Sequence, residues 1–82
     1  MNHFDESYGI VLTEHAEEQG IERDISRDDA MHVLRNPTKT EAALRGCHNV
    51  WGYTPGGKRI RVTINLQTNV VVTLANADRR LQ

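Results

Sequence analysis

Between Lys58 and Leu66 the chain alternates strictly between aliphatic and polar side chains. The aliphatic positions are Ile60, Val62, Ile64 and Leu66, and the positions between them hold Arg59, Arg61, Thr63 and Asn65. Successive side chains of a β-strand point to opposite faces of the sheet, so this segment is predicted to be a strand with one buried face and one face in water. Helices are therefore expected to cover one face of the sheet and to leave the other open.

Turn signals divide the second half of the chain into further strands. Pro55–Gly57 separates the alternating segment from a strand over residues 49–54, and Gln67–Asn69 leads into a strand over residues 70–75. A first strand is expected within residues 39–45. Together these segments predict an antiparallel β-meander of three or four strands.

The alternation also predicts which residues lie opposite one another. If residues 55–57 form a three-residue loop, Val50 opposes Val62 on the buried face, and Trp51 opposes Arg61 on the open face. In the second hairpin, the aliphatic pattern predicts the pairs Leu66–Val70, Ile64–Val72 and Val62–Leu74. This register places Val71 on the open face.

A first helix is predicted from Thr13, as its N-cap, to about Arg23. Gly20 favours an earlier end, since glycine in a helix interior costs about 1 kcal/mol relative to alanine. The short apolar run Ile10–Leu12 before the helix is compatible with a stub of strand or with the entry to the helix.

A second helix is predicted to start at Ser26, because Asp29 stands three residues later, where a capping box has its acceptor. Pro37 is expected to end this helix near Arg35 or Asn36. Its apolar stripe should pack on the sheet and consists of Ala30, Val33 and Leu34.

The chain of 82 residues is expected to form a single α+β domain over residues 10–76, with a flexible N-terminus over 1–9 and a charged tail over 77–82. It has no order of residues typical of a secretory signal and no apolar run near the ~20 residues that span a bilayer. The lone Cys47 excludes an internal disulfide. We therefore expect a cytoplasmic protein that needs no membrane, metal or other cofactor.

Charge is distributed unevenly along the chain. Residues 1–34 contain nine acidic residues against two arginines, whereas residues 35–61 contain six basic residues against Glu41. Such a division is typical of two binding faces, although the two halves can also simply attract each other or remain solvated. If the acidic helices bind a protein partner, the expected contact residues are Glu17, Glu18 and Glu22.

The predicted register places two aromatic and two basic side chains together on the open face, namely Trp51, Tyr53, Arg59 and Arg61. Aromatic rings stack on nucleobases and arginines bind phosphates, so this face is a candidate nucleic-acid surface, which Arg45 and Lys58 would extend. In the alternative interpretation, the arginine stems only cover the rings by cation–π packing.

The order of several short segments resembles a family of small uncharacterised bacterial and phage domains allied to the RelE/ParE toxin superfamily. The segments are Leu12–Ala16, Arg23, Ile25-Ser26, Asn36-Pro37 and Gly52–Val62. The resemblance implies a RelE/ParE-like fold, with helices packed on an antiparallel sheet. Many members of that superfamily are metal-independent ribonucleases, and others act by binding a target protein.

The resemblance also implies roles for particular residues. His15 matches the helix histidine of these domains and would transfer a proton at a pH near neutral. Arg23, Arg59 and Arg61 match basic positions that would neutralise the scissile phosphate. Gln19 stands where a further helix arginine is common, which weakens the expectation of cleavage. By its position alone, His15 is also compatible with a solvated residue of an amphipathic helix.

Two hypotheses follow from the sequence. In the first, the protein is a toxin-type, metal-independent endoribonuclease that acts on RNA and is held by an antitoxin. In the second, it is a non-catalytic inhibitor, immunity or phage counter-defence protein whose acidic N-terminal helices bind a target protein.

Overall fold

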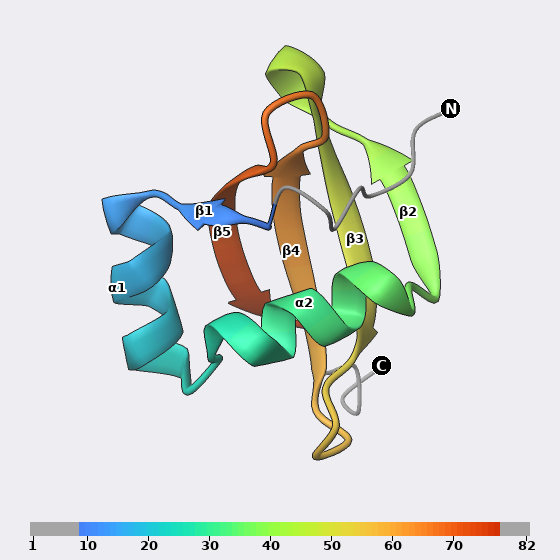
Figure 1. The fold of residues 1–82 in the computed structure, drawn as a ribbon. Coiled ribbons are helices and arrows are strands. Elements are labelled where there is room, and N and C mark those ends of the chain that lie inside the picture. The colour runs from blue at the N-terminus through green and yellow to red at the C-terminus, as the bar shows by residue number, and fades with distance from the viewer. Residues whose placement is uncertain (1–8, 78–82) are drawn as a thin grey trace.

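The computed structural model describes residues 9–77, so the expectations for residues 1–8 and 78–82 lie outside the described residues. The elements follow in the order β1 (Val11–Leu12), α1 (Glu14–Arg23), α2 (Arg27–Arg35), β2 (Lys39–Ala42), a 3₁₀ turn η2 (Leu44–Gly46), β3 (Cys47–Tyr53), β4 (Arg59–Asn65) and β5 (Val70–Asn76). The fold is α+β, with two helices before a meander, as predicted (Figure 1).

The sheet has five strands in the order β1-β5-β4-β3-β2. Strands β2 to β5 form the predicted antiparallel meander, but β1 pairs in parallel with β5, so the sheet is mixed and the expected strand count is corrected. The backbone N–H groups of Val11 and Thr13 each donate a 3.0 Å hydrogen bond, to the carbonyls of Asn69 and Val71. A run of two residues has no periodicity, so this pairing becomes visible only in the tertiary structure.

The register of the first hairpin is the predicted one. Val50 opposes Val62, and Trp51 opposes Arg61. The loop between the strands is closed by reciprocal backbone and side-chain bonds: Thr54 N–H donates to the Lys58 carbonyl at 2.8 Å, and Lys58 N–H donates to Thr54 Oγ1 at 3.1 Å.

The register of the second hairpin was predicted correctly only in part. Val62 opposes Leu74, but a β-bulge between Thr63 and Ile64 shifts the pairing beyond that point. Ile64 therefore opposes Val71, which is fully buried, and Val72 lies on the open face.

The bulge compensates for a longer turn than the sequence suggested. Asn65, not Leu66, pairs with Val70, and the turn between them contains Asn69 in the left-handed region at φ 59°. The N–H groups of Thr68 and Asn69 donate to the Asn65 carbonyl at 3.2 and 2.7 Å. Without an extra residue in the ladder, this turn would place the aliphatic side of β5 in water.

Both helices lie on one side of the sheet, and α2 crosses the strands (Figure 1). The predicted apolar stripe of α2 is buried in the same cluster as Val50, Val62, Ile64 and Leu74 of the sheet. The close approach of α2 depends on Gly52, because a Cβ there would lie 3.0 Å from Val33 Cγ1. No helix of residues 9–77 lies on the other side of the sheet, which is called the open face below.

Capping decides where the two helices begin and end. Ser26 and Asp29 form the predicted capping box, with both reciprocal bonds at 3.0 Å. The first helix ends at Arg23, as predicted, and closes at Asp24 in the left-handed region, so the earlier end that Gly20 allowed is not observed. Gly20 is instead required for packing, since a Cβ there would lie 2.6 Å from the Ile25 carbonyl oxygen. Among residues 9–77, no helix has the length and apolar character needed to cross a membrane.

Candidate functional site

The open face carries a cross-strand row formed by Lys39 of β2, Trp51 of β3 and Arg61 of β4, called the basic-aromatic row below. Trp51 opposes both Lys39 and Arg61, one on each neighbouring strand. The Lys39 ammonium lies 4.8 Å from the centre of the Trp51 ring, within the range of a cation–π contact. Sequence reasoning missed Lys39, because no turn or alternation specifies how β2 pairs with β3.

One nitrogen of the Arg61 guanidinium makes no hydrogen bond to the described part of the protein. Its Nε atom is buried and has no hydrogen-bond partner within the described part of the chain. A buried donor without a partner is costly, and such a donor is satisfied by water or by a ligand. Because this Nε is closed to solvent, a ligand beside the Trp51 ring meets the guanidinium through its terminal nitrogens.

The second pair predicted for this face, Tyr53 and Arg59, is also cross-strand. Tyr53 is half exposed. Arg59 donates from Nη1 to the Ala77 carbonyl at 2.9 Å, so part of its guanidinium holds the end of β5 in place. All four aromatic and basic residues that were predicted to share the open face do share it.

Two other basic residues predicted for the nucleic-acid surface have different environments. The Lys58 ammonium donates to the carbonyls of Arg23 and Asp24, at 2.6 and 2.9 Å, and so caps the C-terminal end of α1. Arg45 is exposed in η2, with a left-handed backbone at φ 60°. Lys58 is therefore occupied by the fold, whereas Arg45 remains available at the opposite end of β3.

On α1, the positions of His15, Gln19 and Arg23 follow the four-residue spacing that places side chains along one side of a helix. Gln19 Oε1 accepts a 2.9 Å hydrogen bond from Leu74 N–H, and Arg23 Nη1 donates a 3.1 Å bond to the Leu74 carbonyl. These two side chains satisfy the outer edge of β5 beyond the end of β1. Arg23 thus has a structural role, and Gln19 is the acceptor that the Leu74 N–H requires.

His15 is the most N-terminal of these three α1 residues and is exposed. Its ring takes part in none of the hydrogen bonds among residues 9–77. The side of α1 that carries these three residues runs along the outer edge of β5, whereas the basic-aromatic row lies on β4, β3 and β2. His15 and the row are therefore on opposite sides of β5. Within the same residues, no three His, Cys, Asp or Glu side chains are grouped to hold a metal ion.

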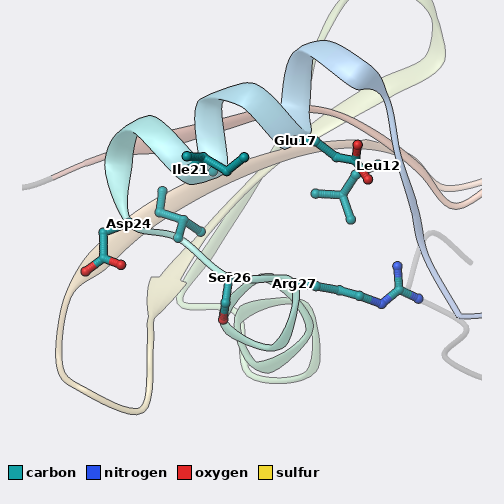
Figure 2. A pocket seen from close by; sticks show the side chains of 8 residues that line it. Leu12, Glu17, Ile21, Asp24, Ser26 and Arg27 are labelled. Carbon is teal, nitrogen blue, oxygen red and sulfur yellow. The ribbon is translucent and has the colours of Figure 1, made fainter.

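A groove of about 720 Å³ lies on the helical side, between α1 and the start of α2 (Figure 2). Its apolar lining includes Leu12 and Ile21, and Glu17, Asp24 and Arg27 contribute charged groups. Ile21 is 85% exposed, although it is a large aliphatic residue. Of the three acidic residues predicted to bind a partner, Glu17 lines this groove, whereas Glu18 and Glu22 are exposed elsewhere on α1.

The fold and these surfaces define a small α+β domain with an aromatic, basic sheet face and an acidic helical side. Residues 12–75 match the model of a domain of unknown function (DUF4258). The match spans most of the chain, and the protein therefore belongs to this family. Comparisons with curated proteins and with solved structures give no match.

Proposed function

We propose that the protein is a RelE/ParE-like, toxin-type protein that binds single-stranded RNA on its open face and cleaves it as a metal-independent endoribonuclease. The observation that best supports RNA binding is the basic-aromatic row, in which the half-buried Trp51 ring lies between two cations. One of these, Lys39, also forms a 3.4 Å ion pair with Glu41. Aromatic rings stack on bases of any sequence, and neighbouring cations attract the phosphates on either side.

Arg61 is the main phosphate ligand in this proposal. It lies opposite Trp51 on the open face, and a phosphate oxygen is the acceptor that an arginine binds most strongly. Arg59 contributes less, since its Nη1 is already bonded to the Ala77 carbonyl.

Cleavage requires a proton transfer, for which His15 is the candidate. The 2′-hydroxyl oxygen of the ribose forms a bond to the adjacent phosphorus, and His15 accepts the proton of that hydroxyl. The bond from phosphorus to the 5′-oxygen breaks, and the 5′-oxygen leaves with a proton from water, so the products are a 2′,3′-cyclic phosphate and a 5′-hydroxyl. Because His15 lies beyond β5 from the row, RNA that reaches it has to cross β5. Arg23 donates from Nη1 to the Leu74 carbonyl, so in this proposal we assign it a structural role.

The binding proposal is tested by titrating labelled single-stranded RNA at two salt concentrations. Arg61→Ala is expected to weaken binding and to lower the salt dependence by about 0.7 in log–log slope, the contribution of one phosphate contact on a single strand. Trp51→Ala should cost about 1–3 kcal/mol of binding free energy. Arg27→Ala removes the same charge from the helical side and serves as the matched control. Wild-type protein that binds no RNA at low salt would refute the proposal.

Cleavage is tested separately, with His15→Ala. Because His15 is exposed, the variant should melt within a few degrees of wild type and bind RNA equally well, yet fail to cleave it. Equal cleavage by the variant would exclude His15 from the chemistry and would leave RNA binding as the function.

Protein binding is a second candidate function, and the exposed Ile21 in the acidic groove beside α1 favours it. An inhibitor or immunity protein would bind a basic surface of its target with this side. Charge reversal at Glu17, which lines the groove, should then weaken a complex isolated from the host more than reversal at Glu18 does. Equal effects of the two variants would argue against the groove as the contact.

A further inference from the structure

A second hollow, of about 860 Å³, lies on the open face at the end away from Tyr53 and Arg59. Residues 42–45 form one side of it, and Cys47 and Asn49 of β3, Thr63 of β4 and Val72 of β5 complete it. The hollow depends on the β-bulge, because the bulge turns Val72 to this face. None of the residues assigned to the basic-aromatic row lines it.

The hollow has aliphatic walls, and two of its polar side chains, Asn49 and Thr63, are hydrogen-bonded to each other. Leu44 is 84% exposed at its edge, and Val72 contributes a second aliphatic surface. Thr63 Oγ1 donates to Asn49 Oδ1 at 2.6 Å. This bond leaves the two hydrogens of the Asn49 amide as donors and the Thr63 oxygen as an acceptor.

The hollow is continuous with the basic-aromatic row. Asn49 is two residues from Trp51 on β3, and Thr63 is two residues from Arg61 on β4, so each is about 7 Å further along the same face. Arg45 adds a cation at the hollow, and its left-handed backbone is unusual for a residue with a side chain. A flat ring with polar edges, attached to a phosphate chain, complements apolar walls, an amide–hydroxyl pair and flanking arginines.

We propose that this hollow is a nucleobase subsite, in which the base next to the one stacked on Trp51 is bound between Leu44 and Val72. The Asn49–Thr63 pair contacts the polar edge of that base, and Arg45 binds a phosphate on the outer side. This inference rests on the proposed RNA-binding function. It adds that the protein distinguishes between bases, whereas the row by itself holds any base.

Two native reporters allow the two proposals to be tested independently. The chain has one tryptophan, Trp51 in the row, and one cysteine, Cys47 in the hollow. Quenching of the Trp51 fluorescence by a short oligoribonucleotide reports occupancy of the row. The rate at which a disulfide reagent modifies the Cys47 thiol reports occupancy of the hollow, because the reaction requires access to the sulfur.

At a saturating concentration, a single-stranded tetranucleotide should quench Trp51 and slow the modification of Cys47 several-fold. A tetranucleotide with one abasic site should still quench Trp51, but it should protect Cys47 less when the abasic site is next to the stacked base. Quenching without any protection of Cys47 would overturn the subsite and leave the row intact. An absence of quenching would overturn RNA binding itself.

Variants test the specificity. Among the four homopolymers, wild type should prefer one, and Asn49→Ala should reduce that preference by about tenfold, the equivalent of one base contact. Leu44→Ala, at a position that is 84% exposed, cannot disturb the core and should weaken Cys47 protection while Trp51 quenching persists. Equal binding of all four homopolymers by wild type, or unchanged protection in Leu44→Ala, would refute the subsite.

Discussion

Replacing Gln19 by alanine is expected to destabilise the protein, although alanine is the better helix former. Gln19 Oε1 is the acceptor for Leu74 N–H, and Leu74 is 0% exposed. Truncation removes this acceptor from a buried donor, and an unsatisfied buried amide costs about 1–3 kcal/mol. Water can enter the space that the half-buried glutamine leaves, so we expect about 1–2 kcal/mol, which is roughly a 4–16 °C fall in melting temperature for a domain of this size.

Two control variants separate the hydrogen bond from other effects of the substitution. Gln19→Glu keeps an acceptor oxygen in place and adds a favourable charge four residues before Arg23, so its stability should lie within about 0.5 kcal/mol of wild type. Glu18→Ala makes the same kind of change at the neighbouring exposed position and should also be nearly neutral. The measurement is thermal and urea unfolding followed by circular dichroism. If Gln19→Ala unfolds together with Glu18→Ala, the edge of β5 does not depend on this side chain.

Gly20→Ala should lower stability by about 1–2 kcal/mol in urea unfolding, since the clash with the Ile25 carbonyl oxygen exceeds the gain in helix propensity. Gly56→Ala should not, because the added Cβ would make only an ordinary 3.9 Å contact with Thr54 Oγ1. A stabilised Gly20→Ala would contradict the packing. Val71→Asp should abolish cooperative unfolding because it places a charge in the core, whereas Val72→Asp, on the open face, should not. The reverse result would indicate a register without the bulge. Ser26→Ala should cost about 1 kcal/mol by loss of the capping box, and no change in the urea midpoint would show that the cap is dispensable.

The parts of the fold that were predictable depend on local patterns. The alternation around Val62 and the turn at Pro55–Gly57 specify the first hairpin, because a slip of one residue would expose every aliphatic side chain of β4. The capping box at Ser26 specifies the start of α2 in the same way. Through that hairpin, the sequence also predicted that Trp51 and Arg61 lie side by side, and this pair is the centre of the candidate site.

Contacts between distant segments decided the rest. The two-residue strand β1 forms because carbonyl groups along β5 accept its backbone hydrogen bonds. Two residues are too few to show a periodic pattern that would predict this pairing. The bulge after Thr63 depends on a turn that takes one residue more than the alternation suggested, and it exchanged the roles of Val71 and Val72.

The roles of the charged and polar side chains were the hardest to predict from sequence. Arg23, Lys58 and Gln19 suit catalysis or ligand binding by residue type, but each satisfies a backbone group of a distant element. Lys39 joined the site only through the pairing of β2 with β3. The sequence by itself determined which side chains are apolar, where the helices are capped and how one hairpin aligns, since these depend on neighbours in the chain. Only the tertiary structure decided which polar side chains are consumed by the fold and which remain free, because that depends on backbone groups brought close from elsewhere in the chain.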